Sequence, residues 1–262
     1  MDATTVMSFA PRRRLWAWLL QASVLLSAGA VPALALAQAW PSKPVRLIVP
    51  NPAGGTADSL PRMLAEALTQ KLGQPVVVEN RPGAAGNIGA EAVYKAEPDG
   101  SVFLAAPPPA LTVNPSLYPK LNHDPTRFEP VTVMATVPNA LLVHPSLPVQ
   151  TLKEFLEYAK ANPGKLSYAS QGSGSTAHLT AELFKLKTGI DMTHVPYKGA
   201  GPAFPDLIGG QVHVMFDNMP SSIEFIKSGK LRALGVTTAK RSAQLPDVPT
   251  VAETVAGYEA SA

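Results

Sequence analysis

The sequence contains no cysteine, which excludes disulfide bonds, thiolate metal sites, iron–sulfur clusters and cysteine nucleophiles. Charged residues make up only 16% of the 262 residues and aromatic residues only 6%. A hydrophobic content of 46% nevertheless argues against a disordered chain. The length is enough for one large domain or two modest ones, each with a real core.

The excess of basic residues is concentrated at the N-terminus. Arg12, Arg13 and Arg14 belong to the 22 Lys and Arg, and removal of residues 1–37 leaves 19 basic against 18 acidic residues. The remaining chain is close to neutral, so it lacks the electrostatic footprint of a nucleic-acid-binding protein. We therefore expect no nucleic-acid partner.

Residues 1–37 have the pattern of an export signal. The three arginines precede an uncharged apolar run, Leu15 to Val31, and sites of the A-x-A type follow at residues 35–37 and 37–39. The run to Trp40 is also long enough for a membrane anchor, but Ser, Gly and Pro residues dilute it. The pattern predicts a signal peptide cleaved near Ala37 or Ala39, and a mature protein in the periplasm.

Beyond the signal, short aliphatic runs alternate with amphipathic helical patterns. Strands are expected at residues 45–49, 75–79, 101–106, 131–143, 166–170, 192–195, 212–216 and 231–237. Helices are expected at 59–72, 88–96, 151–161, 175–187, 200–208 and 221–228, and Thr151 with Glu154 forms a capping box. This alternation predicts the α/β class, with parallel sheets covered by helices and two lobes that join near residue 144.

Two glycine-containing loops, each between a strand and a helix, are candidate anion sites. Residues 51–58 place Gly54 and Gly55 before a helix, where the backbone can approach a ligand, although this string taken alone favours an ordinary turn between a strand and a helix. Residues 170–178 bring Gly172, Ser173, Gly174 and Ser175 to another helix start, with Ser175 a plausible N-cap.

The other polar positions give weaker signals. Asp217 and Asn218 follow a strand where a cleft would open, or they cap the next helix. The glycines at 83–89 have the wrong spacing for a dinucleotide fingerprint. The sequence offers no clear catalytic triad, carboxylate pair, cofactor lysine or metal-type histidine spacing. We therefore expect no catalytic residue, no metal and no cofactor.

Several longer motifs resemble one family across residues 40–253. The chain resembles the Bug-type periplasmic receptors of tripartite tricarboxylate transporters in WPSKPVRLIVP at 40–50, the P-x-G-G-x-x-D turn at 52–58, VENRPGAAGNIG at 78–89, NPSLY at 114–118, HVPYKG at 194–199, GGQV at 209–212, MFDN at 215–218 and LPDVPT at 245–250.

The resemblance implies a two-lobed, type II-like periplasmic-binding-protein fold with the ligand cleft between the lobes. It suggests lobe 1 at 38–143, joined by returning residues 238–262, and lobe 2 at 144–237. It also implies a monomer without catalysis that captures a di- or tricarboxylate, an amino acid or an aromatic acid for membrane transporter subunits. The ligand-binding roles then fall on Ala53, Gly54, Gly55, Thr56, Gly172, Ser173, Gly174, Ser175 and Asp217.

Two other functions stay open from the residues. A serine hydrolase-like enzyme would use Ser173 or Ser175 with His178, but no third member is evident. A sensory binding protein is the other alternative. Members of the family normally continue beyond the segment matching 251–258, so the resemblance also suggests a C-terminally truncated receptor of low stability.

Overall fold

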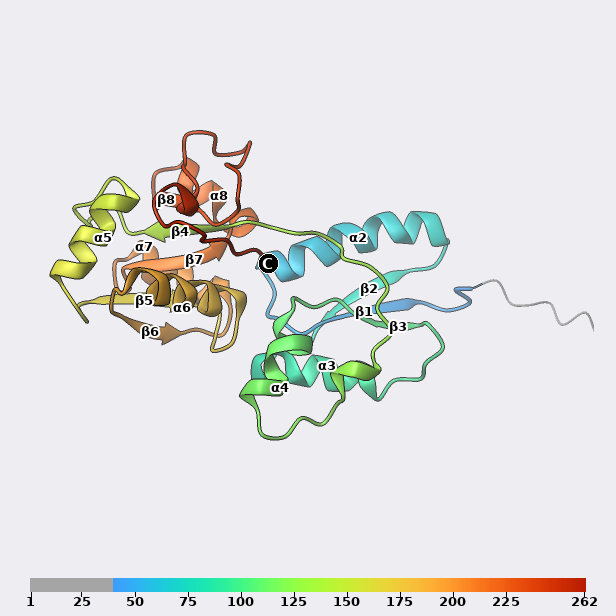
Figure 1. The fold of residues 1–262 in the computed structure, drawn as a ribbon. Helices are drawn as coiled ribbons and strands as arrows, with labels where there is room; N and C mark the ends of the chain where they lie inside the picture. Colours follow the sequence, from blue (N-terminus) through green and yellow to red (C-terminus); the bar gives the residue numbers. More distant parts are fainter. Residues whose placement is uncertain (1–39) are drawn as a thin grey trace, which may run out of the picture. The chain divides into compact units, whose positions relative to one another are not determined.

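The computed structural model describes residues 40–262, and the predicted signal peptide lies outside the described residues. The first sheet contains β1 (Val45–Val49), β2 (Val76–Asn80) and β3 (Val102–Leu104), which are all parallel in the order β2-β1-β3 (Figure 1). Helices α2 (Thr56–Leu72) and α3 (Asn87–Tyr94) connect its strands. Because strand side chains alternate, Val45, Leu47 and Val49 share one face and pack against Ala65 of α2.

The second sheet is mixed. It contains β4 (Asn139–Val143), β5 (Leu166–Ser170), β6 (Met192–Pro196), β7 (Val214–Asn218) and β8 (Arg232–Val236), in the order β6-β5-β7-β4-β8. Strand β5 is parallel to β6 and β7, whereas β4 is antiparallel to both β7 and β8. The expectation of wholly parallel sheets is therefore wrong here, because an inserted antiparallel strand is invisible in a local alternation of strands and helices.

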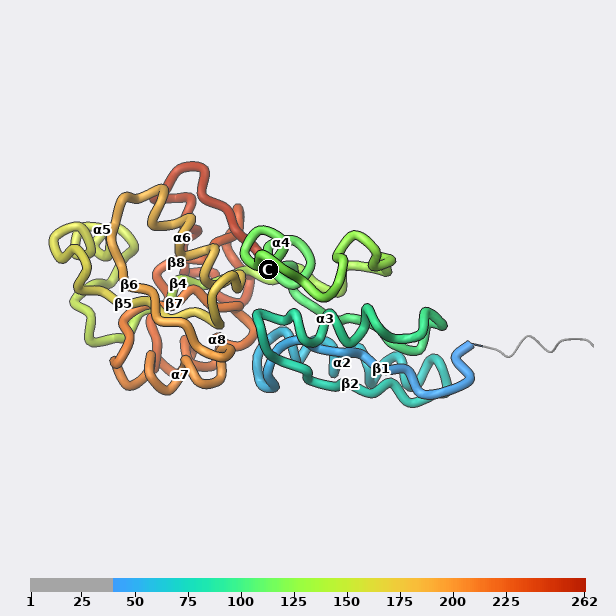
Figure 2. Tube along the Cα trace, turned by 90° about the horizontal axis from the view of Figure 1, so that it is seen from below, coloured from blue at the N-terminus to red at the C-terminus, as the bar shows by residue number. Residues whose placement is uncertain are grey.

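Helices cover both faces of this second sheet. They are α5 (Leu152–Ala161), α6 (Thr176–Thr188), α7 (Ala200–Ile208) and α8 (Met219–Lys227). Leu141 of β4 faces a core shared with α5 and α6, and the next residue, Leu142, faces a core shared with α7. Figure 2 shows α5 and α6 on one side of the sheet and α7 and α8 on the other.

The helix boundaries follow local chemistry. The capping box of Thr151 and Glu154 is present at the start of α5. Gly73 and Gly189, at φ 65° and 69°, end α2 and α6 in the left-handed conformation. Helix α2 begins at Thr56, earlier than expected, and Pro61 removes one backbone hydrogen bond from its second turn.

Two predicted lobe boundaries differ from the strand pairing. Strand β4, assigned to the first lobe at 38–143, pairs with β7 and β8 of the second sheet. The segment 238–262 also packs on this sheet: Val251 and Tyr258 belong to its core, and the Tyr258 hydroxyl donates to the carbonyl of Thr180 at 2.8 Å. Both differences arise from contacts between segments distant in sequence.

The remaining elements are short. They are η1 (Ala84–Gly86), a π-helical turn η2 (Pro109–Val113), α4 (Asn114–Leu117), η3 (Pro125–Arg127) and η4 (Val251–Glu253). The strand expected over 131–143 forms only at β4, and Val131 and Val133 are exposed. Within residues 40–262, none of the helices combines the length and apolar character required to cross a membrane.

Candidate functional site

The first glycine loop is braced by the helix that follows it. The Gly54 amide donates to Asp58 Oδ2 at 3.1 Å, and Asn80 Nδ2 donates to Asp58 Oδ1 at 2.8 Å and to the Asn51 carbonyl at 3.0 Å. Burial of Asp58 opposes its ionisation, but hydrogen bonds from Arg62, Asn80 and Gly54 hold the pKa of this carboxyl below its usual value. The loop therefore has a fixed shape.

The loop presents backbone rather than charged side chains. Ala53 and Gly54 are exposed, and Gly55 is the extended N-cap of α2 with no side-chain cap hydrogen bond. Helix geometry leaves the amides of Thr56 and Ala57 without a carbonyl partner in α2. These amides lie at the positive end of the helix dipole, which favours an anion.

A chain of hydrogen bonds joins this loop to the end of β7. Thr56 Oγ1 donates to Ser221 Oγ at 3.2 Å, and Ser221 Oγ donates to Asp217 Oδ2 at 2.6 Å. Gln171 Nε2 donates to the other carboxylate oxygen, Asp217 Oδ1, at 2.8 Å. Burial raises the pKa of Asp217 to about 6 in spite of these two donors.

The second glycine loop is organised by His178. Ser175 is the N-cap of α6, as predicted, and accepts a hydrogen bond from the His178 amide at 3.3 Å. The Gly174 amide donates to His178 Nδ1 at 3.1 Å. Gly172 and Gly174 have φ of 121° and 79°, which glycine adopts without strain. Ser173 is the exposed residue between them.

Behind this loop lies a stack of rings. His178 and His194 have ring centroids 4.2 Å apart, and His194 lies 4.8 Å from the ring of Tyr168. Burial lowers the pKa of His178, and burial together with the neighbouring His178 lowers the pKa of His194 to about 4. His194 Nε2 forms a 2.7 Å hydrogen bond with Ser170 Oγ, which also accepts from the Gly172 amide. Both imidazoles therefore support the loop.

This geometry does not assemble the nucleophile and base of the hydrolase hypothesis. His178 Nδ1 accepts from the Gly174 backbone, and the Ser175 hydroxyl accepts from the His178 amide. Neither contact activates a serine hydroxyl.

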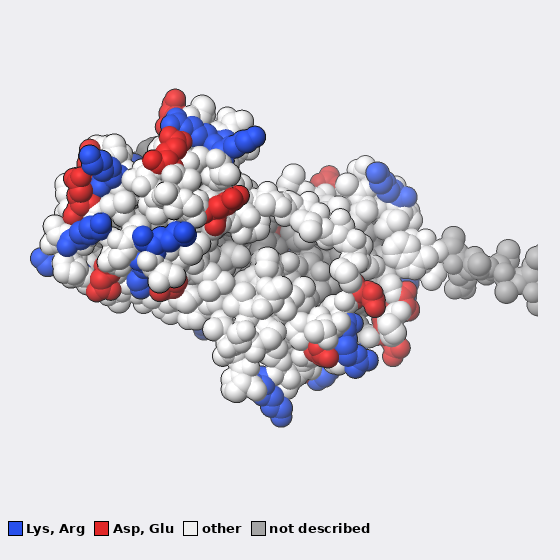
Figure 3. Space-filling model, viewed as in Figure 1, with Lys and Arg blue, Asp and Glu red and all other residues white. Residues whose placement is uncertain are grey.

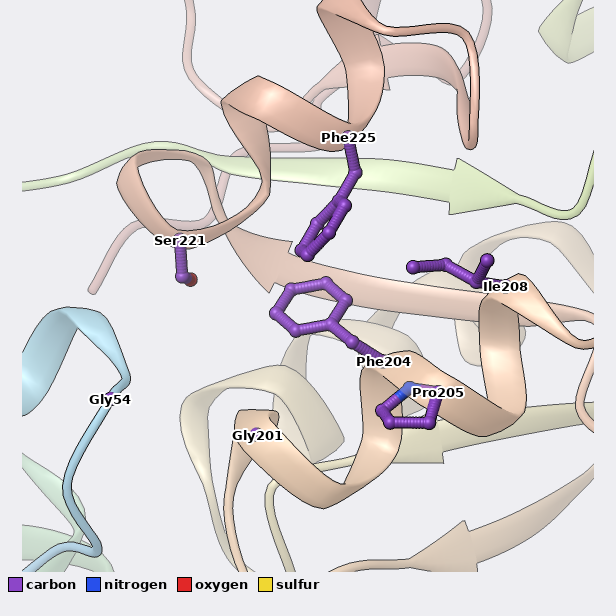
Figure 4. Close-up of a pocket in the computed structure, with 7 residues that line it drawn as sticks. All are labelled: Gly54, Gly201, Phe204, Pro205, Ile208, Ser221 and Phe225. Atoms are coloured by element: carbon purple, nitrogen blue, oxygen red, sulfur yellow. The ribbon is translucent and has the colours of Figure 1, made fainter.

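A cavity of about 420 Å³ lies where three helices begin (Figure 4). It is lined by Gly54, Gly201, Phe204, Pro205, Ile208, Ser221 and Phe225. Gly54 precedes α2, Gly201 is in the first turn of α7, and Ser221 is in the first turn of α8. None of these three helix starts is capped by a side-chain hydrogen bond, whereas Ser175 caps α6. At α8 the Met219 amide donates to the Pro138 carbonyl at 2.9 Å and Pro220 has no amide hydrogen, so the amides that helix geometry leaves open near the cavity are chiefly those at the starts of α2 and α7.

The structure brings together part of the predicted site. Gly54 lines the cavity, and Thr56 and Asp217 are connected to it through Ser221. Residues 172–175 do not line this cavity. A Cβ at Gly174 would instead lie 2.5 Å from Leu117 Cδ1, which places the second loop against α4.

Residues that sequence reasoning did not single out form most of the cavity. Ser221, Gly201, Phe204 and Phe225 were not predicted as site residues. A signal was present in Gly199 and Gly201, which form a third glycine-containing turn between a strand and a helix. A Cβ at Gly55 would lie 4.0 Å from Ala200 Cβ, so the first and third turns are neighbours.

Charged groups are scattered rather than concentrated. On the face shown in Figure 3, basic and acidic side chains are interspersed. Within residues 40–262, no group of three His, Asp or Glu residues is placed to hold a metal ion. An anion at the cavity would therefore be held by backbone amide dipoles.

The two sheets, their helices and this cavity define a solute-binding protein of the two-lobed α/β type. Residues 60–262 match the family model described as "Tripartite tricarboxylate transporter family receptor". The chain belongs to this family, TctC. The predicted family and fold class are thereby confirmed.

Sequence relatives and solved structures support the same assignment. The chain is 40% identical to protein BugT of Bordetella pertussis over 232 residues, which cover 88% of this chain and 71% of BugT. Among solved structures, "R. palustris Rpa4515 with adipate" has a TM-score of 0.82 and 44% identity, covering 85% of this chain and 75% of that one. Periplasmic binding protein BugD has a TM-score of 0.78 and 38% identity, with 85% and 75% coverage.

A further structure is MatC (Rpa3494) of Rhodopseudomonas palustris with bound malate, with a TM-score of 0.76, 31% identity and 85% and 76% coverage. The chain spans 64% to 71% of the length of the first curated relatives that it matches. The matched family is described as a receptor family and BugD is a periplasmic binding protein, so the chain is a receptor rather than an enzyme.

Proposed function

We propose that this receptor captures a small carboxylate in the periplasm and delivers it to the membrane subunits of a tripartite tricarboxylate transporter. The observation that carries the proposal is the cavity at the uncapped starts of α2, α7 and α8, which is lined by no charged side chain. Backbone amides at helix N-termini bind carboxylates without a cationic side chain.

The two related structures with adipate and malate support a carboxylate as the ligand. In this proposal the carboxylate lies at the turn formed by Ala53, Gly54, Gly55 and Thr56. The amides of this turn hold it, apart from the Gly54 amide, which donates to Asp58. Residues 172–175 form the opposing loop, and Asp217 orients Ser221 and Gln171. The name of the family and the periplasmic relative BugD support export and the transport role.

Native mass spectrometry of gently purified protein, followed by calorimetry with a panel of carboxylates, tests the proposal. We expect a co-purified acid, or saturable binding of at least one panel member. Uncharged analogues of the same acids, such as their amides, are the control and should not bind. Absence of binding by every carboxylate would overturn the proposal, and turnover of a carboxylic ester would favour the hydrolase alternative.

A further inference from the structure

The walls of the cavity are apolar over most of their extent. The rings of Phe204 and Phe225 have centroids 4.7 Å apart at an interplanar angle of 46°. Figure 4 shows these two rings facing each other, with Pro205 and Ile208 farther along α7. Among the described residues that line the cavity, Ser221 alone has a polar side chain.

Ser221 offers the cavity an acceptor rather than a donor. Its proton has two acceptors within the protein, Asp217 Oδ2 at 2.6 Å and the Asn218 carbonyl at 2.8 Å. Its oxygen also accepts from Thr56. A ligand carboxylate would meet lone pairs at Ser221, so it is better placed at the amides beside Gly54 and Gly201.

The rest of the ligand then lies against Phe204, Pro205, Ile208 and Phe225. A hydroxyl or a second carboxylate in that position would lose water without gaining a hydrogen-bond partner, which carries a large free-energy penalty. An apolar part of the ligand would instead bury its own surface and that of two phenylalanine rings, which is favourable. The volume of about 420 Å³ is within the range of roughly 300–1,000 Å³ typical of small-molecule sites.

We propose that the receptor selects carboxylates with an apolar body, an aromatic ring or an unbranched aliphatic chain, over short hydroxylated di- and tricarboxylates. This selection rests on the proposed carboxylate-binding function and assigns the α7–α8 wall as its determinant. The carboxylate binds at the amide edge, and the apolar body occupies the space beside Phe204 and Phe225.

Calorimetry of the exported, mature protein with benzoate, hexanoate, malate and citrate tests the selection. We expect benzoate or hexanoate to bind at least about tenfold more tightly than malate and citrate, since small apolar differences in such a pocket change affinity about 10- to 200-fold. Phe225→Ala should weaken binding of the apolar acids about tenfold. Leu186→Ala, at an exposed position on α6, is the control and should leave affinity unchanged.

Ile208→Lys provides a test in the opposite direction. A cation beside the apolar wall should weaken hexanoate binding and strengthen binding of citrate, and circular dichroism verifies the fold of each variant. If carboxylates bind but malate and citrate match or exceed the apolar acids in wild type, the selection is wrong and the carboxylate function stands. If no carboxylate binds, both proposals fail.

Discussion

Thr56 and Ser221 lie 165 residues apart in sequence, and their hydroxyl oxygens are 3.2 Å apart. Thr56 begins α2, next to the first sheet, and Ser221 lies in the first turn of α8, next to the second sheet. Because Ser221 also donates to the buried Asp217, the conformation of one loop is coupled to a polar group of the other sheet.

Ser221→Ala should lower the free energy of unfolding by about 2 kcal/mol, because the buried Asp217 loses a charged hydrogen bond. Ser222→Ala is a matched control at the next position of α8. Its hydroxyl is buried but bonds only to carbonyls of residues 218 and 219 at 3.4 Å, so its loss should cost less than about 1 kcal/mol. Urea denaturation at pH 7 compares the two variants, and equal losses would show that the Ser221–Asp217 contact contributes little.

Asp217 should make stability fall as the pH rises from about 4 to 6. Its folded-state pKa of about 6 lies above the ordinary value of 3.8, so the native state binds the proton more tightly than the unfolded state in this window. The proton on Asp217 stabilises the native state by about 3 kcal/mol below pH 3.8. This stabilisation decreases as the pH rises and is lost above pH 6.

Asp217→Asn removes this titration while keeping most of the geometry. The new amide oxygen can accept from Gln171, and Ser221 can turn its proton to the Asn218 carbonyl at 2.8 Å. The variant should therefore gain stability relative to wild type between pH 4 and 6 and keep that gain above pH 6. Denaturation at a series of pH values measures the difference, and a pH-independent difference would contradict the assigned titration. A changed ranking of amino acids against plain dicarboxylates would show that Asp217 also influences selectivity.

Two substitutions of Gly55 distinguish a steric effect on ligand binding from an effect on folding. Its φ of −99° is open to any residue, and an added Cβ would lie at ordinary contact distance, 4.0 Å, from Ala200 Cβ. Gly55→Ala should therefore fold with wild-type stability. Gly55→Val adds methyl groups between the first turns of α2 and α7 and should weaken carboxylate binding at least about tenfold. Calorimetry measures the ligand affinity of both variants, and thermal melting measures their stability. Equal affinity of the two variants would show that this turn does not contact the ligand.

Local sequence chemistry predicts the elements better than their arrangement. Residues adjacent in sequence are sufficient to predict the capping box at Thr151, the N-cap at Ser175 and most strand positions. The antiparallel placement of β4 and the pairing of Phe204 with Phe225 depend on contacts between distant segments. Ser221 shows what sequence reasoning misses. Nothing in the sequence separates it from the other serines, and its role is evident only from its contacts with Thr56 and Asp217 in the folded protein.

The histidine stack should make the second loop sensitive to acid. The folded-state pKa of His194, about 4, lies below its ordinary value of 6.5, because burial and the neighbouring His178 both disfavour the cation. The stabilisation is therefore complete above pH 6.5 and is lost as the pH falls toward 4. The charged groups beside the stack are Glu182, which favours the cation of His194, and Lys185, which opposes it.

Protonation of His178 Nδ1 would also abolish the hydrogen bond that it accepts from the Gly174 amide. We therefore expect the amide resonances of residues 172–175 to broaden or shift between pH 6 and 4, together with the imidazole resonances of the two histidines. Nuclear magnetic resonance titration of the carbon-bound ring protons measures both midpoints directly. His178→Gln removes the neighbouring cation that disfavours protonation of His194 and should move the midpoint of His194 upward, since the repulsion between the two cations is lost. A midpoint of His194 at its ordinary value would show that the ring is solvated and that the stack does not support the loop.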